Sequence, residues 1–385
     1  MNNFGRRKEV KKSKIFVTAV SLALLLSGCG GKKPQAPEGY QELFTGGSFD
    51  EYMVWTTDDE QYSDLISQLS AKCENILEGS LMVATDDKVI YAGGWNSIET
   101  DGETRVNPFT TYEIGSVTKQ MTAACILQQV QAGNLKTDET IDKYFPEFPY
   151  AHKITIDNLL HMDSGIVDYV NNPYKFYKGT GTNAATKFTD GKMTDEEILS
   201  FLNRTELEFE PGTKFAYSNT NYYLLALILE QVTGETYAEY IQKNIFDVCG
   251  MQNSTSCEVG NITSVPAEMC GGEYMQAGKS ARGAGDVHSN VCDMLLWDRA
   301  LMSNKVIDAN QLEYMTQMRN GYSCGWMESE GKYLEHTGST MAYVSTNTIL
   351  EVEGLGKVYV IVMMPNGMEG YFMKEVIDIV VDYFK

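Results

Sequence analysis

Hydrophobic and polar positions alternate along this chain with two periods, and each period predicts one type of secondary structure. Between residues 64 and 77 the apolar residues return every three or four positions, which is typical of one buried face of a helix. Residues 80–84 and 89–92 alternate residue by residue around a polar turn, which predicts a β-hairpin. Further strands are predicted near the C-terminus, over 325–327, 332–336, 343–350 and 357–364.

A nearly all-apolar segment over 117–131 predicts a helix that is buried on every side. From about residue 136 to 270 the pattern predicts helices and loops only, and a last helix covers 369–384. The helices between them are expected over 155–161, 194–203, 221–233 and 237–248, and another through 295–297. Because strands lie at both ends of the chain, we predict one α+β domain whose sheet uses both ends and which carries an all-α insertion. The pattern contains no βαβ alternation, which argues against a doubly wound nucleotide-binding fold.

The N-terminus has the pattern of an export signal. A basic stretch is followed by mostly apolar residues over 15–26, a run too short for a membrane-spanning helix. It ends in Leu26-Ser27-Gly28-Cys29, which looks like a bacterial lipobox, so we expect a signal peptide over 1–28 and lipidation of Cys29. Residues 29–45 are then a flexible tether, and the protein is held on the outer face of the cell membrane. The alternative is an ordinary secretory signal with a chance cysteine.

Composition excludes several classes of function. The chain has 385 residues with 31 Lys and Arg against 52 Asp and Glu, a net charge of −21, so no basic surface for a nucleic-acid partner is expected. Four histidines and the lack of a Cys-x-x-Cys pair argue against a structural zinc site. We expect no metal and no organic cofactor.

Seven cysteines follow Cys29, and an odd number cannot all pair within the chain. Cys73 and Cys125 lie on apolar helix faces and are expected to be buried thiols. Three others, Cys249, Cys257 and Cys270, fall close together in a loop-rich stretch, where one disulfide is possible. The sequence leaves this pairing open.

Ser116 and Lys119 stand one turn apart at the start of the predicted buried helix. A serine hydroxyl needs a base to become a nucleophile, and a lysine can serve when burial keeps it neutral. The alternative is an N-cap serine followed by a solvated lysine. The same Ser-x-x-Lys spacing recurs at Ser329 and Lys332, but there it falls in a predicted turn and is a chance copy.

Two more segments carry candidate chemistry. A Pro-Gly turn at 211–212 leads to Tyr217 and Asn219, which can present a phenol and an amide to one cleft, with the phenol acting as a second base near neutral pH. The similar residues 169–171 lack this turn. The segment 335–340 ends a strand with His336, and Gly338 within it would let a substrate strand approach the backbone closely. Taken singly, Tyr217 could be a core tyrosine and His336 a surface histidine.

Together the three motifs, at about 116, 217 and 336, resemble those of the penicillin-recognising serine hydrolases, most of all the group of class C β-lactamases, D-aminopeptidases and esterases. The resemblance runs over about 50–385 and includes the stretches 159–165, 211–234, 244–251 and 281–297. It implies one site with these roles: Ser116 as nucleophile, Lys119 and Tyr217 as general bases, Asn219 as the group that orients lysine and substrate, His336 and Gly338 as cleft lining, and the N–H groups of Ser116 and Ser339 as an oxyanion hole.

The resemblance also implies a fold and its boundaries. The hydrolase domain is expected over 46–385, with an α/β lobe over about 46–135 and 275–385 and a helical lobe over about 136–274. An antiparallel sheet flanked by N- and C-terminal helices is expected in the first lobe, beside the all-α second lobe.

Two residues depart from the family pattern. His336 stands where most β-lactamases and transpeptidases have a lysine that anchors a substrate carboxylate, so anchoring should be weaker and pH-dependent here. Asp163 stands where threonine is common, and we have no physical account of it.

We therefore hypothesise a membrane-anchored extracytoplasmic serine hydrolase that forms an acyl-enzyme. Its expected partners are small-molecule or peptide substrates, among them D-amino-acid peptides of the cell wall, esters or β-lactams. The rival hypothesis is a non-catalytic or slowly deacylating penicillin-binding sensor, or a surface-binding lipoprotein.

Overall fold

The computed structural model describes residues 34–74, 78–96, 106–176, 193–256, 278–329, 333–366 and 372–385, all of which belong to one unit of the chain. The predicted signal peptide and Cys29 lie outside these residues. Cys257, Cys270 and Lys332 also lie outside them, so the predicted lipidation, the possible disulfide to either cysteine and the second Ser-x-x-Lys pair stay predictions.

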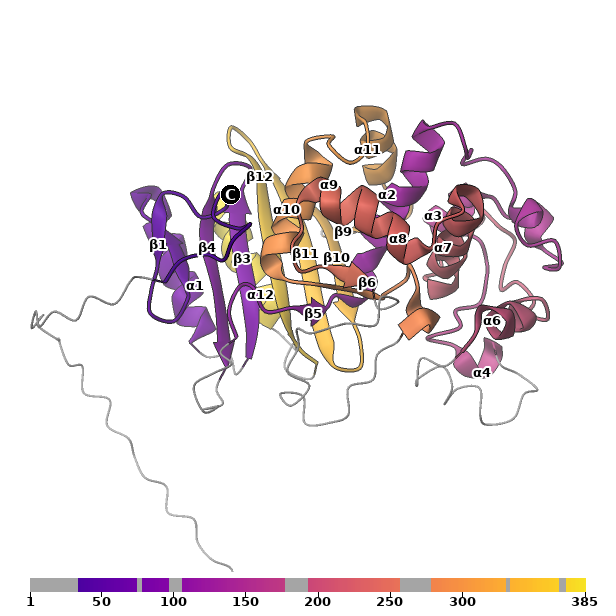
Figure 1. Ribbon diagram of the computed structural model, residues 1–385, viewed down its shortest axis with the longest axis horizontal. Coiled ribbons are helices and arrows are strands. Elements are labelled where there is room, and N and C mark those ends of the chain that lie inside the picture. Colours follow the sequence, from indigo (N-terminus) through magenta and orange to yellow (C-terminus); the bar gives the residue numbers. More distant parts are fainter. Residues whose placement is uncertain are drawn as a thin grey trace, which may run out of the picture. The chain divides into compact units, whose positions relative to one another are not determined.

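An antiparallel sheet built from both ends of the chain organises the fold (Figure 1). Strand β3 (Glu78–Thr85) pairs with β12 (Gly356–Pro365), so the indigo and yellow ribbons lie side by side. Within the described residues nine strands follow the order β1 (Gly47–Phe49), β2 (Trp55–Thr57), β4 (Val89–Asn96), β3, β12, β11 (Tyr343–Val352), β10 (Tyr333–Ser339), β9 (Trp326–Ser329) and β8 (Tyr322–Ser323). The predicted α+β class, the hairpin and the antiparallel sheet are thereby confirmed.

Each face of the sheet packs against a different set of helices, because successive side chains of a strand point to opposite faces. Leu81 and Val83 of β3 belong to the core formed with α1 (Ser63–Cys73) and α12 (Phe372–Phe384). Met82 and Ala84 belong to the larger core on the other face, which includes residues of α2 (Thr118–Gln131) and α10 (Val291–Met302). The N- and C-terminal helices thus flank the sheet as expected.

Helices predominate between α2 and α10, and in Figure 1 most of them lie to the right of strands β10 and β11. They are α3 (Ile156–Leu160), α4 (Pro173–Phe176), α6 (Asp195–Leu202), α7 (Asn219–Thr233), α8 (Tyr237–Ile241) and α9 (Asp247–Cys249), the last two joined by the π-helical segment Gln242–Phe246. Single 3₁₀ turns cover Glu60–Tyr62, Gly115–Val117, Ile141–Lys143, Ala151–Lys153 and Gly278–Ala281.

Local sequence explains where two of these helices begin and end. Thr194 caps α6 in a capping box with Glu197, since each side chain bonds the other residue's backbone N–H. Gly234 ends α7 in the left-handed conformation that glycine adopts without strain, at φ 74°. Helix α2 lies against α7, α8 and α11 (Ala309–Thr316) and is buried on nearly every side, as predicted.

The folded body begins earlier than residue 46. Tyr40 is 1% exposed, and its hydroxyl donates to Asp293 at 2.8 Å, while Leu43 is buried. The prediction of a tether as far as residue 45 is therefore wrong from Tyr40 onward, because hydrophobic periodicity does not reveal a single aromatic anchor in a polar segment.

Several short strands and one helix were not predicted from the sequence pattern. Strands β5 (Tyr112–Glu113), β7 (Val287–Ser289) and β6 (Thr255–Ser256) form a second, three-stranded sheet, so the stretch expected to be all-α supplies one strand. Strands β1 and β2 were missed as well, because two or three residues carry no measurable period. The eight-residue helix α11 was also missed, and it buries only Met315. Cys249 is a free buried thiol.

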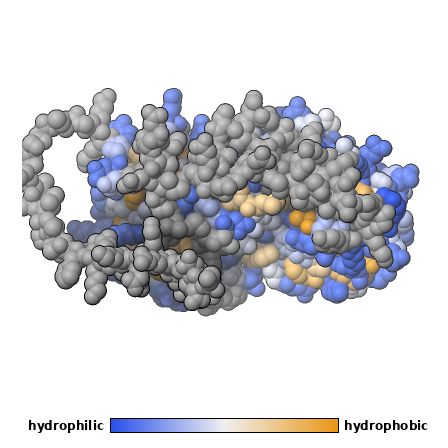
Figure 2. Space-filling view, turned by 90° about the horizontal axis from the view of Figure 1, so that it is seen from below, coloured by the Kyte–Doolittle hydropathy of each residue, from blue (hydrophilic) through white to orange (hydrophobic). Residues whose placement is uncertain are grey.

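The described surface on the face in Figure 2 is mostly hydrophilic, with hydrophobic residues in a few small areas, consistent with the acidic composition. No helix among the described residues is long and apolar enough to span a bilayer.

Candidate active site

Ser116 sits in the 3₁₀ turn that leads directly into α2, and Lys119 lies in the first turn of that helix. The turn requires a left-handed residue, which Gly115 supplies at φ 51°. The Lys119 Nζ lies 3.0 Å from the Ser116 Oγ, while the lysine side chain is fully buried and the serine is partly exposed. The predicted nucleophile and base are therefore in direct contact.

Three oxygens surround the Lys119 amine. Besides Ser116, it donates to the Asn219 Oδ1 at 2.8 Å and to the backbone carbonyl of Ala284 at 2.6 Å. A carbonyl oxygen only accepts, so these two oxygens bind two N–H groups of the amine. When the amine is neutral, its lone pair is left facing the Ser116 hydroxyl, which is the geometry of a general base.

Burial makes the neutral amine available. Removal of Lys119 from water lowers its pKa from its ordinary value to about 7, although the charges of Asp168 and Asp286 oppose the shift. At pH 7 and above a large share of the molecules therefore carries the unprotonated base. The predicted role of Lys119 fits both its position and its titration.

Asp168 fixes the orientation of the Asn219 amide. The Asn219 Nδ2 donates to the Asp168 Oδ2 at 3.0 Å, so the Oδ1 of the same amide must face Lys119. Asp168 is itself held by the backbone N–H of Val170 at 2.8 Å and by the Asn171 side chain at 2.7 Å. Asp168 is thus a positioning residue for the lysine.

The role of Asp168 was not predicted from the sequence. Residues 169–171 were interpreted as a copy of the second motif that lacks its turn, but Val170 and Asn171 line the pocket. The available signal was the position of Asp168, three residues after the stretch 159–165 that resembles the family. Asn219 was expected just before the helix predicted over 221–233, whereas it is the first residue of α7, after Ser218 as N-cap.

Tyr217 lies in the site but does not fit the role of a base that is ionised near neutral pH. Burial raises its pKa above the ordinary value for a phenol, and the neighbouring Ser116 hydroxyl opposes this shift only in part. The Lys119 Nζ lies 5.1 Å from the Tyr217 ring centroid. The predicted ionisation of Tyr217 near neutrality is therefore wrong, and the residue is a phenol with a proton to donate.

His336 is buried on the opposite side of the site from Asn219, and its ring centroid lies 6.1 Å from that of Tyr217. Its Nδ1 lies 2.7 Å from the Thr337 carbonyl oxygen. Burial and the nearby Lys119 charge lower the pKa of His336 from its ordinary value to about 3, despite the bond to Thr337. A neutral ring agrees with the expected weaker anchoring of a carboxylate, whereas the expected pH dependence is wrong, since the ring stays neutral at physiological pH.

Gly338 has a packing role rather than the predicted place in the cleft. A Cβ at this position would lie 1.9 Å from the Ile114 carbonyl oxygen, so only glycine lets β10 approach the turn that carries Ser116. Gly338 is buried and is not among the residues that line the pocket. The prediction that it leaves room for a substrate strand is wrong.

Ser339 comes close to the nucleophile's turn. A Cβ at Gly115 would lie 2.9 Å from the Ser339 backbone nitrogen, so the segments carrying the backbone N–H groups of Ser116 and Ser339 lie against each other. Both residues line the pocket. The arrangement brings together the two donors of the predicted oxyanion hole.

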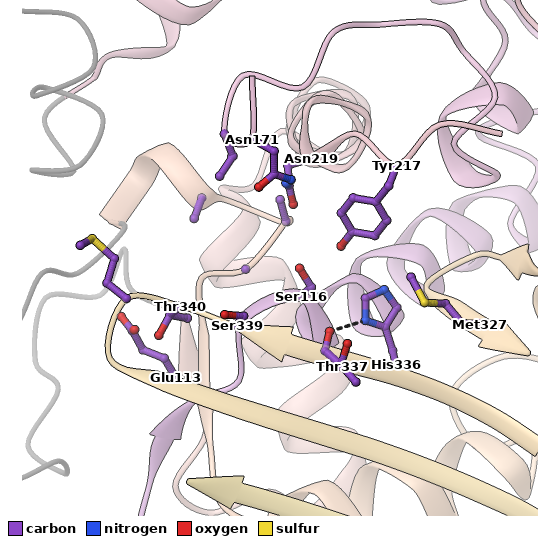
Figure 3. A pocket seen from close by; sticks show the side chains of 16 residues that line it. Glu113, Ser116, Asn171, Tyr217, Asn219, Met327, His336, Thr337, Ser339 and Thr340 are labelled. Atoms are coloured by element: carbon purple, nitrogen blue, oxygen red, sulfur yellow. Dashed lines mark hydrogen bonds between the residues drawn. The ribbon is translucent and has the colours of Figure 1, made fainter. Parts of the chain in front are cut away.

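One pocket joins these groups, and Ser116 lies at its centre (Figure 3). In that view Tyr217 and Asn219 approach from one side and His336 and Ser339 from the other. The remaining lining is mainly small or apolar and includes a few polar side chains: Glu113, Gly115, Val170, Asn171, Ala281, Ala284, Gly285, Met327, Thr337, Thr340 and Met341. The described residues contain no cluster of side chains suited to a metal ion.

The similarity of this chain to known proteins supports the same family as the three motifs do. The family model described as Beta-lactamase matches residues 63–380, which is most of the chain and includes all three motifs. Among curated proteins, the Bacillus subtilis (strain 168) protein PbpX, which bears a penicillin-binding-protein name, is 26% identical over 270 residues, 67% of this chain and 64% of its own length. Protein flp of Staphylococcus aureus (strain MW2) is 30% identical over 205 residues, 52% of this chain and 39% of its own length. The chain thus spans less than two thirds of either relative.

Solved structures share the fold at low identity. The D-amino acid amidase of Ochrobactrum anthropi SV3, complexed with D-phenylalanine, matches 84% of this chain and 98% of its own with a TM-score of 0.64 and 20% identity. FmtA of Staphylococcus aureus matches 85% of this chain and 90% of its own with a TM-score of 0.64 and 17% identity. At these identities the likeness supports the fold alone.

Proposed function

This chain belongs to the Beta-lactamase family, and from that premise we propose that it is a serine hydrolase that cleaves amide or ester bonds through an acyl-enzyme on Ser116. The observation that carries the proposal is the 3.0 Å contact between the Ser116 hydroxyl and a lysine amine whose other two N–H groups are taken by Asn219 and Ala284.

Acylation follows from this geometry. Neutral Lys119 accepts the Ser116 proton while the Oγ attacks the carbonyl carbon, and the carbonyl oxygen becomes an anion that faces the N–H groups of Ser116 and Ser339. When the intermediate collapses, the bond to the leaving nitrogen or oxygen breaks, and Tyr217 donates its proton to the leaving group. The Lys119 ammonium then gives a proton to the Tyr217 phenolate, so the site ends neutral with an ester on Ser116.

Deacylation repeats these transfers with water. Lys119 accepts a proton from the attacking water, whose oxygen forms the new bond to the acyl carbon. The bond between that carbon and the Ser116 Oγ then breaks, and the proton returns to the serine. Both steps use the same lysine, so its protonation state limits the whole cycle.

The place of action is a further part of the proposal. The basic and apolar N-terminal stretch ending in Cys29 supports export and lipid anchoring on the outer face of the membrane. D-amino-acid peptides of the cell wall, small esters and β-lactams are the candidate substrates there. Metabolic labelling with a clickable palmitate tests the anchor, since Cys29→Ala should lose both the label and membrane retention.

The reaction itself is tested by active-site labelling. A fluorophosphonate and a fluorescent penicillin are each incubated with the wild-type protein and with Ser116→Ala, and the intact mass is measured. We expect at least one probe to add its mass to the wild type and neither to the variant. If no probe adds mass to the wild type, the protein is a binding or sensor protein and the proposed reaction is wrong.

A further inference from the structure

Asp286 is a fully buried carboxyl group that the proposed mechanism does not use. It is 0% exposed and lies in the segment that follows the 3₁₀ turn Gly278–Ala281 and supplies the Ala284 carbonyl to Lys119. A carboxylate is costly to bury unless it is paired or hydrogen-bonded. The groups to which Asp286 bonds therefore indicate why it is there.

Both carboxyl oxygens of Asp286 accept hydrogen bonds. The backbone N–H of Gly283 donates to the Oδ1 at 2.8 Å, and the hydroxyl of Ser256 in β6 donates to the Oδ2. The first of these bonds closes a turn over residues 283–286, and Ala284 lies inside that turn. Donors on both oxygens also favour the ionised form of the carboxyl group.

The same turn is fixed to helix α2. The Thr122 hydroxyl donates to the Gly283 carbonyl oxygen at 2.7 Å, and the Lys119 amine donates to the Ala284 carbonyl oxygen at 2.6 Å. A Cβ at Gly283 would come within 2.7 Å of a side chain of α7, so the turn has little room to shift. By closing this turn, Asp286 determines where the Ala284 carbonyl points.

The charge of Asp286 acts on the same amine. Among the described residues, Asp286 and Asp168 are the carboxylates whose charges raise the Lys119 pKa against the effect of burial. Asp168 acts on the geometry of the amine through Asn219, and Asp286 acts on it through Ala284. When Lys119 accepts the serine proton, an ammonium forms away from water, where a nearby negative charge stabilises it strongly.

Other titratable side chains lie around Lys119 and Asp286 and keep one charge state near pH 7: His288, His336, Tyr217 and Tyr222. Burial lowers the pKa of the two histidines to about 4 and about 3, and it raises the pKa of both tyrosines above the ordinary value for a phenol. The remaining charged side chains nearby lie within 4 Å of a partner: Arg282 of Asp195 and Glu230, and Glu113 of His288. Since the Lys119 pKa is about 7, a rate that changes through neutral pH reports the charge of this lysine.

We propose that Asp286 is a positioning residue for Lys119. Its carboxylate holds the turn over 283–286 so that the Ala284 carbonyl faces the amine, and its negative charge stabilises the ammonium that forms when Lys119 takes the Ser116 proton. The inference rests on the proposed hydrolase function and adds a residue that acts on its base.

The pH profile of Ser116 labelling tests the charge. The rate of fluorophosphonate labelling is measured between pH 5 and 9 for the wild-type chain and for Asp286→Asn. The asparagine keeps an acceptor for the Gly283 N–H but has no charge, so the Lys119 pKa should fall. We expect the midpoint of the profile to move to lower pH by about one pH unit, with a loss of maximal rate below about threefold.

A second variant tests the position of the turn. Asp286→Ala removes the acceptor as well as the charge, so its midpoint should move in the same direction and its maximal rate should fall by about tenfold relative to Asp286→Asn. Because alanine is smaller, it also guards against misfolding of the asparagine variant. The control is Asp298→Asn in α10, since Asp298 is equally buried but bonds to Asn347 at 2.7 Å; its midpoint should stay at the wild-type pH.

The outcomes separate this inference from the function on which it rests. If Ser116 of the wild type is not labelled at all, the proposed function fails first. If it is labelled but the Asp286 variants keep the wild-type midpoint, or Asp298→Asn moves the midpoint as far, only the charge role of Asp286 is overturned. If Asp286→Ala reaches the maximal rate of Asp286→Asn, its role in positioning the Ala284 carbonyl is overturned.

Discussion

The helices that face the sheet from its two sides differ in what they bury. Helices α1 and α12 bury only apolar side chains and one cysteine: Leu65, Leu69, Cys73, Phe372, Val376, Ile377 and Val380. Helix α2 buries Thr118, Lys119 and Gln120 in succession before its apolar residues begin. Helices α1 and α12 therefore contribute stability by removing apolar surface from water, whereas α2 also removes polar groups from water.

This difference shows that burial of polar groups at the start of α2 has a cost in stability. A buried lysine is unfavourable unless it loses its charge, and Lys119 has its pKa lowered to about 7 by burial. The same desolvation that costs stability produces a base at neutral pH. We expect substitutions on the two sides to separate activity from stability almost completely.

The largest expected effect is on activity at α2. Lys119→Met should lower kcat/KM for a nitrophenyl ester by about 10³-fold, since a general base contributes roughly 10²–10⁴. Its free energy of unfolding should not fall, because a buried amine is replaced by an apolar group of similar length. Ester hydrolysis and urea unfolding measure the two quantities, with exposed Lys136→Met as control. A variant that keeps its activity would contradict the assignment of the base.

The second effect is on stability, at the opposite face. Leu69 is fully buried between α1 and the sheet, so Leu69→Ala should lower the free energy of unfolding by about 2–5 kcal/mol. The specific activity of the folded fraction should stay unchanged. Leu355→Ala, at an exposed turn, is the control and should change stability by less than about 0.5 kcal/mol. A large loss of kcat in folded Leu69→Ala would break the separation of the two sides.

A smaller effect is expected at Asp168, where orientation and charge can be distinguished. Asp168→Ala removes the acceptor that fixes the Asn219 amide and should slow labelling of Ser116 by roughly 10–100-fold. Asp168→Asn keeps an acceptor but removes a charge that raises the Lys119 pKa, so its pH profile should move to lower pH with little loss of maximal rate. Exposed Asp58→Asn is the control. Equal losses in both variants without a pH shift would reduce Asp168 to a structural residue.

The smallest effect is the pH dependence of the wild type. Because Lys119 must be neutral to accept the serine proton, the rate of Ser116 labelling should rise with pH through about 7 and then level off. Stability should rise over part of the same range, since the unfolded lysine binds a proton that the folded one has lost. Stopped labelling reactions between pH 5 and 9 measure the first quantity. A profile that is flat across pH 7 would show that Lys119 is not the limiting base.

Much of the fold could be predicted because its long strands and helices have a clear hydrophobic period in the sequence. Strands β3, β4, β11 and β12 and helices α2, α7 and α12 lie where the patterns indicated, within a few residues. The short strands and the anchor at Tyr40 were not found, since their stability comes from partners far away in the chain, such as Asp293. Local pattern carries no information about such contacts.

Within the site, the sequence indicated which residues take part, but not how each titrates or what each faces. Tyr217 and His336 were expected to be a near-neutral base and a pH-dependent anchor, and burial moves both pKa values away from those roles. Gly338 was correctly singled out but for the wrong neighbour, the substrate instead of the Ile114 carbonyl.

By itself the sequence determined the family, the class of fold and the identity of the serine and lysine, because these depend on residue types at short spacing. Only the tertiary structure decided that the Asn219 amide, fixed by Asp168, and the Ala284 carbonyl take two of the amine's hydrogens, and that burial lowers the pKa of His336. Both decisions depend on which groups from distant segments exclude water from one another, and no local pattern encodes that.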